Sequence, residues 1–358
     1  MRIPRKMEHV HHALQLGQSG LNGFDDIKLI HNCLPDTSLE RIALQTRIGE
    51  LSLSSPIIIN AMTGGARETE EINRELAIAA REQGLAMAVG SQMAAIKNPE
   101  VAASYRIVRE MNPNGIVFGN LGSEATLEQA LQAVDMLRAD GLQIHLNVMQ
   151  ELIMPEGDRV FTGMLERISR IVSEVGVPVM VKEVGFGMAR ESAEALIAAG
   201  VQMIDIGGTG GTNFAAIENA RRDSALDWLN DWGMKTSIAL LEVLEAARRT
   251  GTDRVDVIAT GGISNALDVC KALVLGASGV GMAGALLRTL RTQGTEALIR
   301  HIETLHDDLR LLMTALGAGT VTALHRVPVV ITGENAVWCQ ARDIDIRQYA
   351  SRQGYFQH

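Results

Sequence analysis

Eight short apolar runs, separated by amphipathic stretches, constrain the fold more than any other feature of this sequence. The runs begin near Ile57, Ala86, Ile116, Leu142, Val177, Gln202, Val255 and Ser278. They do not alternate between apolar and polar residues, which is typical of strands that are buried on both faces. The intervening stretches 69–83, 125–138 and 189–199 carry apolar residues at helical spacing. This βα alternation predicts a parallel sheet with right-handed crossovers.

The size of the repeated region favours a closed barrel over an open, doubly wound sheet. The eight units between residues 57 and 295 occupy close to the roughly 250 residues of a typical (β/α)8 barrel. We therefore predict an α/β fold, a (β/α)8 TIM barrel over 57–295. Residues 1–56 are interpreted as an N-terminal extension that contributes to a substrate site, and 296–358 as a partly helical C-terminal extension. The long interval 207–233 is expected to form a loop at the carboxyl ends of the strands.

Charge and composition exclude several classes of protein. The 358 residues include 33 basic and 42 acidic side chains, a formal charge of −9, which argues against a nucleic-acid binder. There is no apolar run of 18 residues and no apolar stretch near the start, so we expect neither a membrane span nor an export signal. The three cysteines form no CxxC pair, which fits neither a disulfide framework nor a zinc site. These features favour a cytoplasmic location.

Polar side chains follow several of the predicted strands. They include Asn60, Ser91, Asn120, His145, Asn147, Gln150, Glu151 and Lys182. Because barrel active sites lie at the carboxyl ends of the strands, we expect these residues to gather at one end of the barrel.

Two glycine-containing turns follow the last two predicted strands, at Gly261-Gly262 and Ala283-Gly284. A single pair is explained as well by a tight βα turn. Two pairs on adjacent strands, where barrels commonly bind phosphate through loop amides and a helix N-terminus, favour a phosphate site. The match of 279–284 to the GxGxxG pattern overlaps the predicted strand itself, so we reject a dinucleotide-binding Rossmann fold.

Lys182 ends an apolar strand and has three possible roles: a Schiff-base nucleophile, a counter-ion for a flavin, or a salt bridge with Glu183. The polar groups Thr63, Ser91 and Asn120 suit the edge of a flat heteroaromatic ring. Together with Lys182 they favour flavin mononucleotide over a Schiff base.

Several motifs of this chain are unusual enough to indicate a family. They are R-K-x-E-H at 5–9, A-M-T-G-G at 61–65, A-V-G-S-Q at 88–92, H-L-N-x-x-Q-E-L at 145–152, K-E-V-G-F-G at 182–187, G-G-T-N-F at 210–214 and A-x-G-G-I at 259–263. In these motifs and their spacing, from about residue 4 to 345, the sequence resembles the type 2 isopentenyl-diphosphate isomerases. The sequence departs from the family at two positions: some members carry Ser in place of Gly207, and many carry Arg in place of Met93.

The resemblance implies an enzyme that interconverts isopentenyl diphosphate and dimethylallyl diphosphate in isoprenoid biosynthesis. It implies reduced FMN as a cofactor, NADPH to reduce it, Mg²⁺, and a homotetramer or homooctamer. Moving the double bond requires that one proton be delivered and another removed, and N5 of the reduced flavin is our candidate for both. His145, Asn147 and Gln150 are expected to position the substrate.

The resemblance also implies binding roles for particular residues. The flavin contacts are Ala61, Met62, Thr63, Ser91, Asn120, Lys182, Thr212, Gly261, Gly262, Ala283 and Gly284. The substrate contacts are Arg5, Lys6, Ser91, Gln92, Met93 and Gln150, and the Mg²⁺ ligand is Glu151.

Two other functions are considered. A different FMN-dependent barrel, of the 2-hydroxy-acid oxidase or dihydroorotate dehydrogenase type, needs a base such as a His-Arg pair after the seventh strand. The segment A-T-G-G-I-S at 259–264 contains neither residue. A non-enzymatic phosphate-binding barrel would be colourless when purified.

Overall fold

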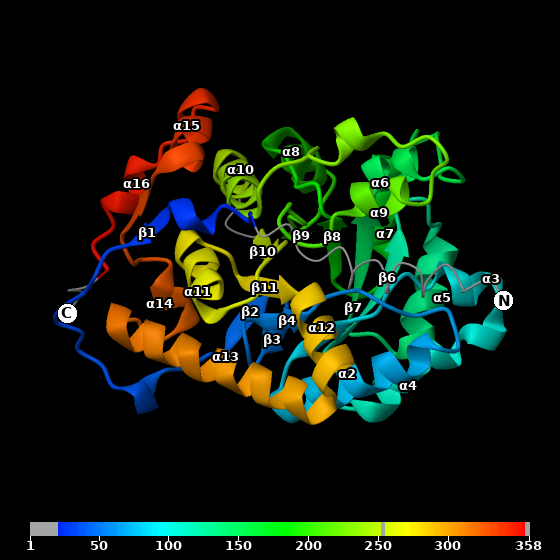
Figure 1. Ribbon diagram of the computed structural model, residues 1–358, viewed down its shortest axis with the longest axis horizontal. Helices are drawn as coiled ribbons and strands as arrows, with labels where there is room; N and C mark the ends of the chain where they lie inside the picture. Colours follow the sequence, from blue (N-terminus) through cyan, green and yellow to red (C-terminus); the bar gives the residue numbers. More distant parts are fainter. Residues whose placement is uncertain (1–20, 252–254, 355–358) are drawn as a thin grey trace.

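The eight predicted strands form a closed parallel barrel in the order β4-β5-β6-β7-β8-β9-β10-β11 (Figure 1). The computed structural model describes residues 21–251 and 255–354. The strands are β4 (Ile57–Ile59), β5 (Ala86–Ala88), β6 (Val117–Gly122), β7 (Gly141–Leu146), β8 (Val179–Glu183), β9 (Met203–Asp205), β10 (Asp256–Thr260) and β11 (Gly279–Met282). The prediction of a TIM barrel is confirmed, and so is the rejection of a Rossmann fold, because β11 belongs to the barrel.

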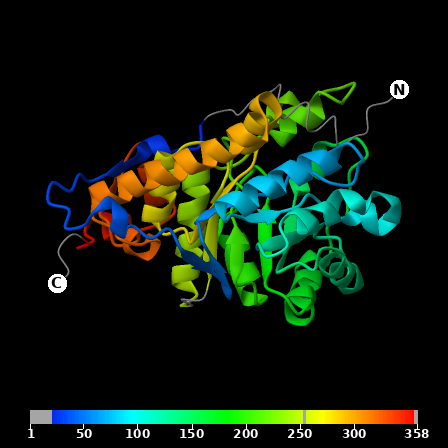
Figure 2. The same ribbon diagram turned by 90° about the horizontal axis from the view of Figure 1, so that it is seen from below.

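Helices surround the strands, as Figures 1 and 2 show. They are α2 (Thr69–Gln83), α3 (Met93–Lys97), α4 (Ala103–Met111), α5 (Leu127–Leu137), α6 (Val148–Ile153), α7 (Met164–Glu174), α8 (Arg190–Ala198), α9 (Phe214–Asn219), α10 (Thr236–Arg249), α11 (Ala266–Leu275) and α12 (Gly284–Gln293), with short 3-10 turns η3 (Pro99–Val101) and η4 (Asp227–Leu229). The three predicted helical stretches correspond to α2, α5 and α8. The long interval 207–233 contains α9 and η4 rather than an unstructured loop.

A β-hairpin from the N-terminal extension closes the end of the barrel at which the strands begin. We call this the lower end, and the end with the carboxyl ends of the strands the upper end. It consists of β2 (Thr46–Ile48) and β3 (Leu51–Leu53), which pair antiparallel. Ile48 and Leu53 are buried in one cluster with barrel residues such as Phe118 and Met180. A side chain at Gly279 would lie 2.7 Å from Ile48 Cδ1, so this glycine makes room for the hairpin. The sequence analysis did not predict this hairpin.

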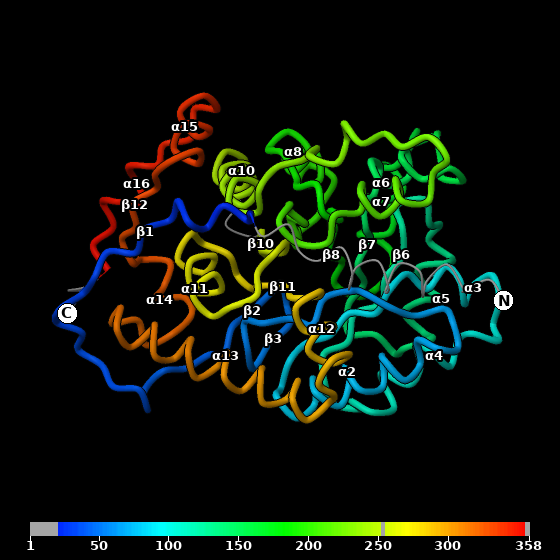
Figure 3. Tube along the Cα trace, viewed as in Figure 1, coloured from blue at the N-terminus to red at the C-terminus, as the bar shows by residue number. Residues whose placement is uncertain are grey.

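The two extensions pair with each other. Strand β1 (Ile27–Leu29), after η1 (Phe24–Asp26), runs antiparallel to β12 (Val329–Ile331), and Figure 3 shows the N-terminal segment beside the C-terminal one. The C-terminal extension continues as α15 (Gly333–Ala341) and α16 (Arg347–Ala350). Of the N-terminal extension, Asn22 reaches the upper end of the barrel, where its Nδ2 donates to Gly262 O at 3.2 Å.

Helix α13 (Thr295–Leu316), followed by α14 (Val321–Leu324), confirms the predicted C-terminal helix. It runs beside α2 in both ribbon views, near η2 (Leu39–Arg41). Its buried His306 Nε2 lies 2.8 Å from Ser55 Oγ, which also accepts a hydrogen bond from Ile57 N. A hydroxyl has one proton and two acceptor lone pairs, so Ser55 can donate to His306 or accept from it, depending on the imidazole tautomer. Within the described ranges, no helix is long and apolar enough to cross a bilayer.

The buried His306 predicts a pH-dependent stability. Burial, with a smaller effect of Arg310, lowers the pKa of His306 to about 4 from its ordinary 6.5. Between these two pH values the unfolded chain binds a proton that the folded chain does not, so stability decreases as the pH falls from 6.5 towards 4. We expect His306 to lower the free energy of unfolding by up to about 3 kcal/mol over that window. The free energy of unfolding of His306→Gln should fall less over the same window. Urea unfolding at several pH values measures the effect; equal pH slopes for both proteins would contradict it.

Candidate active site

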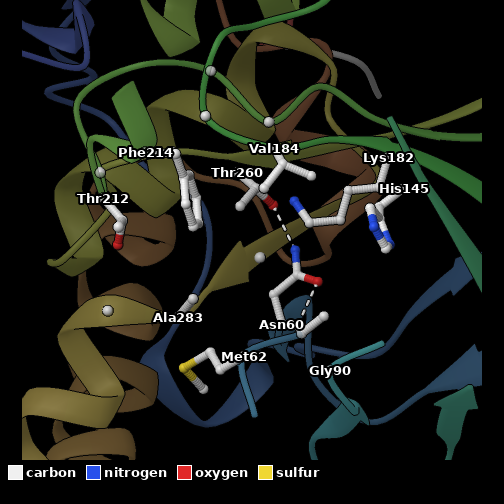
Figure 4. A pocket seen from close by; sticks show the side chains of 18 of the residues that line it. Asn60, Met62, Gly90, His145, Lys182, Val184, Thr212, Phe214, Thr260 and Ala283 are labelled. Carbon is white, nitrogen blue, oxygen red and sulfur yellow. Dashed lines mark hydrogen bonds between the residues drawn. The ribbon is translucent and has the colours of Figure 1, made fainter. Parts of the chain in front are cut away.

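A cavity of about 290 Å³ lies at the carboxyl ends of the barrel strands (Figure 4). It is lined by Asn60, Ala61, Met62, Thr63, Gly90, Ser91, Asn120, His145, Gln150, Lys182, Val184, Gly185, Gly207, Gly208, Gly211, Thr212, Phe214, Thr260, Gly261, Gly262, Ile263, Gly281, Ala283, Gly284 and Leu287. All eleven residues predicted to contact a flavin are in this lining, together with His145 and Gln150. Six of the eight predicted polar strand-end residues thus lie together, whereas Asn147 and Glu151 are not part of this lining.

A second cavity, of about 280 Å³, lies at the opposite end of the barrel. It is bordered by Arg81, Asn112 and the start of β5 and β6, and Asn112 Nδ2 has no hydrogen-bond partner among the described residues. Barrel enzymes carry out their chemistry at the carboxyl ends of the strands, so we take the first cavity as the candidate site.

A buried ion pair lies at one side of the cavity. Lys182 Nζ is 3.4 Å from Asp205 Oδ2, and it donates to the backbone oxygen of Glu183 at 3.0 Å. Lys182 is only 7% exposed and Asp205 is fully buried. The partner of Lys182 is thus Asp205, on the neighbouring strand β9, and not the carboxylate of Glu183. Since each charge compensates the other, the ammonium can remain at the cavity wall.

A chain of side-chain amides extends from this ion pair across the barrel. Asn60 Nδ2 donates to Asp205 Oδ2 at 2.6 Å and lies 3.0 Å from Thr260 Oγ1. Gln143 Nε2 donates to Asn60 Oδ1 at 3.0 Å, and Gln143 Oε1 accepts from Asn120 Nδ2 at 3.0 Å.

The amide chain ends at His145. Asn120 Oδ1 lies 2.9 Å from His145 Nδ1. In Figure 4, His145 and Lys182 lie close together, and Phe214 lies on the opposite side of the cavity. His145 is therefore both hydrogen-bonded within the barrel and part of the cavity wall.

The glycine turns hold two loops against each other. Gly261 (φ +130°) lies against Gly208, and a Cβ at Gly261 would come within 2.2 Å of Gly208 O. Gly262 (φ +67°) meets Gly210 in the same way, with a Cβ 2.4 Å from its carbonyl carbon. Glycine is required at both positions because backbone packs directly on backbone there. The sequence indicated a tight turn or a phosphate site but not this contact.

Helix α12 points its N-terminus into the cavity. It begins at Gly284 after Ala283, no side chain caps it, and its first turn has no acidic residue. Ala283, Gly284 and Leu287 all line the cavity. The first amide groups of a helix carry a partial positive charge, so this end can bind a phosphate.

The loop after β7 brings a third group of polar residues to the cavity. Gln150, on α6, donates through Nε2 to Glu218 Oε1 at 2.9 Å, and Glu218 is fully buried on α9. Arg221 forms an ion pair with the other oxygen of Glu218 at 2.5 Å. Because the amide nitrogen of Gln150 is directed to Glu218, its carbonyl oxygen is available to face the cavity.

Four predicted residues lie outside the cavity lining. Gln92 is fully buried, with its Nε2 donating to Ala133 O at 2.9 Å and its Oε1 accepting from Asn120 N at 2.9 Å. Met93 begins α3. Asn147 and Glu151 form a hydrogen bond of 2.8 Å at the start of α6. The predicted Arg5 and Lys6 lie outside the described residues.

Sequence reasoning missed several residues of the site. Asn60 was expected at this end of the barrel without an assigned role, whereas Asp205, Gln143 and Glu218 were not among the predicted site residues. Glu183 lies between two residues of the lining, Lys182 and Val184, and burial raises its pKa to about 8, even though its Oε2 accepts from Phe186 N at 2.7 Å and from Gly187 N at 3.0 Å.

Comparison with known sequences identifies close relatives. A family profile described as FMN-dependent dehydrogenase matches residues 113–330. The chain is 54% identical over 352 residues to an isopentenyl-diphosphate delta-isomerase of Geobacillus sp. (strain WCH70), covering 98% of this chain and 99% of that protein. It is 53% identical to the isopentenyl-diphosphate delta-isomerase of Bacillus licheniformis, with the same coverage.

Comparison with solved structures identifies the same barrel in more distant proteins. A lactate oxidase of Pediococcus acidilactici matches with a TM-score of 0.68 at 15% identity, covering 93% of this chain and 96% of that chain. A mandelate oxidase variant with benzaldehyde matches with a TM-score of 0.63 at 18% identity, covering 90% of this chain and 94% of that one. At these identities the likeness concerns the fold alone.

The contact between the glycine turns can be tested by adding one methyl group. Gly261→Ala is expected to destabilise the protein by about 1–3 kcal/mol more than Gly276→Ala, because a methyl group collides with Gly208 only at position 261. Gly276 is the matched control, since its φ of +131° nearly equals that of Gly261 and its nearest contact is an ordinary 3.4 Å to Leu244. Chemical denaturation of both variants measures the difference; equal losses of stability would contradict this packing.

Proposed function

Because this chain belongs to the FMN-dependent isopentenyl-diphosphate delta-isomerases, we propose that its barrel cavity is where isopentenyl diphosphate and dimethylallyl diphosphate are interconverted. The observation that carries the function is the identity of 54% over 98% of the chain to a named isomerase. The location of the site in the cavity is our proposal. It is supported by the polar and cationic groups that converge there.

The distant oxidases do not favour an oxidase activity for this chain. Strand β10 is followed by Gly261 and Gly262, and the cavity wall there contains neither a His-Arg pair nor another base. The isomerase remains the favoured function over a hydroxy-acid oxidase or a dihydroorotate dehydrogenase.

The cavity fits FMN, which the family uses. We propose that the phosphate binds at the uncapped N-terminus of α12 and the turn at Gly261-Gly262, because both offer backbone amides without a competing carboxylate. The ring would then lie against Ala61–Thr63, with Lys182 as the positive charge beside it. When bound, the reduced flavin supplies an acid and a base for the proton shift, and N5 is our candidate.

The chain's own residues would bind the substrate and exclude water. Phe214, Val184, Ile263 and Leu287 make the walls apolar, which suits the isoprenoid chain and keeps the site dry during proton transfer. Gln150, oriented by Glu218, would present its carbonyl oxygen to the reacting carbons. His145 would contact the substrate from the opposite wall, and Asn147 would act through Glu151, with which it is hydrogen-bonded.

Glu151 fits a Mg²⁺ site that is completed by the diphosphate. Among the described residues, no three acidic, His or Cys side chains are arranged to hold a metal by themselves. Glu124, however, has its pKa raised by burial and by the nearby Glu151 and Asp158, so negative charge accumulates beside Glu151. One carboxylate with waters and substrate phosphates is usual for Mg²⁺. We propose that Glu151 is its protein ligand.

The remaining expectations concern the N-terminal arm and the diphosphate. Asn22 lies at the mouth of the barrel, where its side chain donates to Gly262 O and its backbone oxygen accepts from Ser237 N at 3.0 Å. A chain that enters there can return over the cavity, so we propose that Arg5 and Lys6 bind the diphosphate with Ser91, and that Gln92 and Met93 assist from the start of α3. On this basis 1–56 contributes to the substrate site of the 57–295 barrel.

Three further proposals follow from the family resemblance alone. They are NADPH as the reductant of the flavin, a cytoplasmic location, and assembly into a homotetramer or homooctamer.

The function is tested by the redox state of the flavin. The photoreduced protein, incubated under nitrogen with isopentenyl diphosphate and Mg²⁺, is expected to form dimethylallyl diphosphate without net oxidation of the flavin. With the flavin kept oxidised, the rate should be lower by at least about 100-fold, because the flavin then lacks the proton at N5. Product analysis by NMR measures both rates. Full turnover with oxidised flavin would overturn the role of N5, and no product in either state would overturn the proposed function.

The metal proposal is tested at Glu151. In Glu151→Gln we expect the Mg²⁺ concentration for half-maximal activity to rise about tenfold or more, because the ligand loses its charge. Glu166→Gln is the matched control, since Glu166 is exposed on the following helix α7. An unchanged Mg²⁺ requirement in Glu151→Gln, with flavin still bound, would exclude Glu151 as the ligand.

A further inference from the structure

The buried amides between Asp205 and His145 have a single possible direction. We propose that Asn60, Gln143 and Asn120 form a relay, anchored on Asp205, that fixes the tautomer of His145 with its proton on Nδ1. In this relay Gln143 is a positioning residue, because it is fully buried and is not part of the cavity lining.

The direction is set at the Asp205 end. A carboxylate can only accept hydrogen bonds, and Asp205 accepts from Asn60 Nδ2 at 2.6 Å and from Gly207 N at 3.1 Å, beside Lys182 Nζ at 3.4 Å. Asn60 must therefore direct its NH₂ group to Asp205 and its oxygen away. The amide of Ala61 reinforces this orientation, since its N–H donates to Asn60 Oδ1 at 2.8 Å. A backbone N–H cannot accept, so both contacts require the same orientation.

Each following bond transmits this direction. The oxygen of Asn60 needs a donor, so Gln143 presents its NH₂ group at 3.0 Å and its oxygen on the other side. That oxygen accepts from Asn120 Nδ2 at 3.0 Å, which leaves Asn120 Oδ1 directed to His145. Reversing one amide would place two acceptors or two donors opposite each other in a buried region, where an unpaired polar group is costly.

The last bond determines the proton on the imidazole. Because Asn120 Oδ1 can only accept, the nitrogen 2.9 Å from it, Nδ1 of His145, must carry the hydrogen. A neutral His145 with its hydrogen on Nδ1 then carries none on Nε2. Strand register supports a stable arrangement, since Asn120 is paired with Gln143, and His145 with Lys182, on neighbouring strands.

Space for the relay is built into the barrel. A Cβ at Gly281 would lie 2.5 Å from Asn60 Nδ2 and 2.1 Å from Thr260 Oγ1, so only glycine fits beside this contact. Thr260 itself cannot set a direction, because its hydroxyl can donate or accept. Any role for Nε2 in the isomerisation rests on the function proposed above, whereas the tautomer does not.

The tautomer is measured by NMR rather than by activity. In the ¹⁵N-histidine-labelled holoprotein, at a pH where imidazoles are neutral, the two-bond ¹H–¹⁵N correlations of His145 should show hydrogen on Nδ1 alone. A spectrum of His145→Gln identifies these signals among the nine histidines of the chain. A ring with hydrogen on Nε2 in the wild-type protein would overturn the proposal, and this test needs no variant in the relay.

Cutting and repairing the relay tests its mechanism. Gln143→Met keeps the length of the side chain but removes both bonds, so Asn120 can rotate and the single tautomer should be lost. Adding Asn120→Asp to Gln143→Met places a carboxylate beside Nδ1 and should restore it. Thr260→Val removes one hydrogen-bond partner of Asn60, but Asp205 still sets the orientation of the Asn60 amide. The His145 spectrum of this variant should therefore match that of the wild type. An unchanged tautomer in folded Gln143→Met would overturn the relay.

Turnover of the same samples separates the two proposals. Hydrogen on Nδ1 in a wild-type protein that makes no dimethylallyl diphosphate would reject the proposed function and leave the relay intact. Hydrogen on Nε2 in an active isomerase would reject the relay alone.

Discussion

The ion pair between Lys182 and Asp205 is the interaction on which the upper end of the barrel depends. Asp205 has no exposed surface, and a charge without a partner in such a place would be strongly destabilising. Lys182, Asn60 and the amide of Gly207 together compensate it. Since Asn60 is held in this way, the neighbouring amides are also fixed, and a polar layer forms above an apolar barrel core.

The same arrangement gives the cavity two chemically different poles. On one side, Lys182 and His145 are held rigidly by buried groups. On the other, the N-terminus of α12 and the glycine turns offer backbone amides. The apolar side chain of Phe214, at the start of α9, also lines the cavity. A net charge of −9 is thus compatible with the anionic ligands proposed above, because local dipoles and single cations can attract an anion whatever the overall charge.

The extensions are part of the barrel rather than separate units. The β2–β3 hairpin fills the lower end, and β1 pairs with β12, so the two extensions are joined beside the barrel. Strands β1, β2 and β3 stand outside the repeated βα pattern that identified the barrel strands, and the pairing partner of β1 is about 300 residues away. This explains why the N-terminal strands were missed whereas the eight barrel strands, which repeat regularly, were found.

The sequence by itself determined the fold class and the edge of the barrel at which the polar residues meet. Strand ends are set by local runs such as Ile57–Ile59, and barrel geometry brings all carboxyl ends together. Only the tertiary structure decided which polar groups pair. In the sequence, Gln143 looks like an ordinary strand residue and Glu218 like a residue of a loop helix. The fold brings Gln143 within hydrogen-bond distance of Asn60, 83 residues away in sequence, and Glu218 within hydrogen-bond distance of Gln150, 68 residues away. Hydrogen-bond direction depends on such neighbours, so the sequence shows the residues of the site but not their orientation.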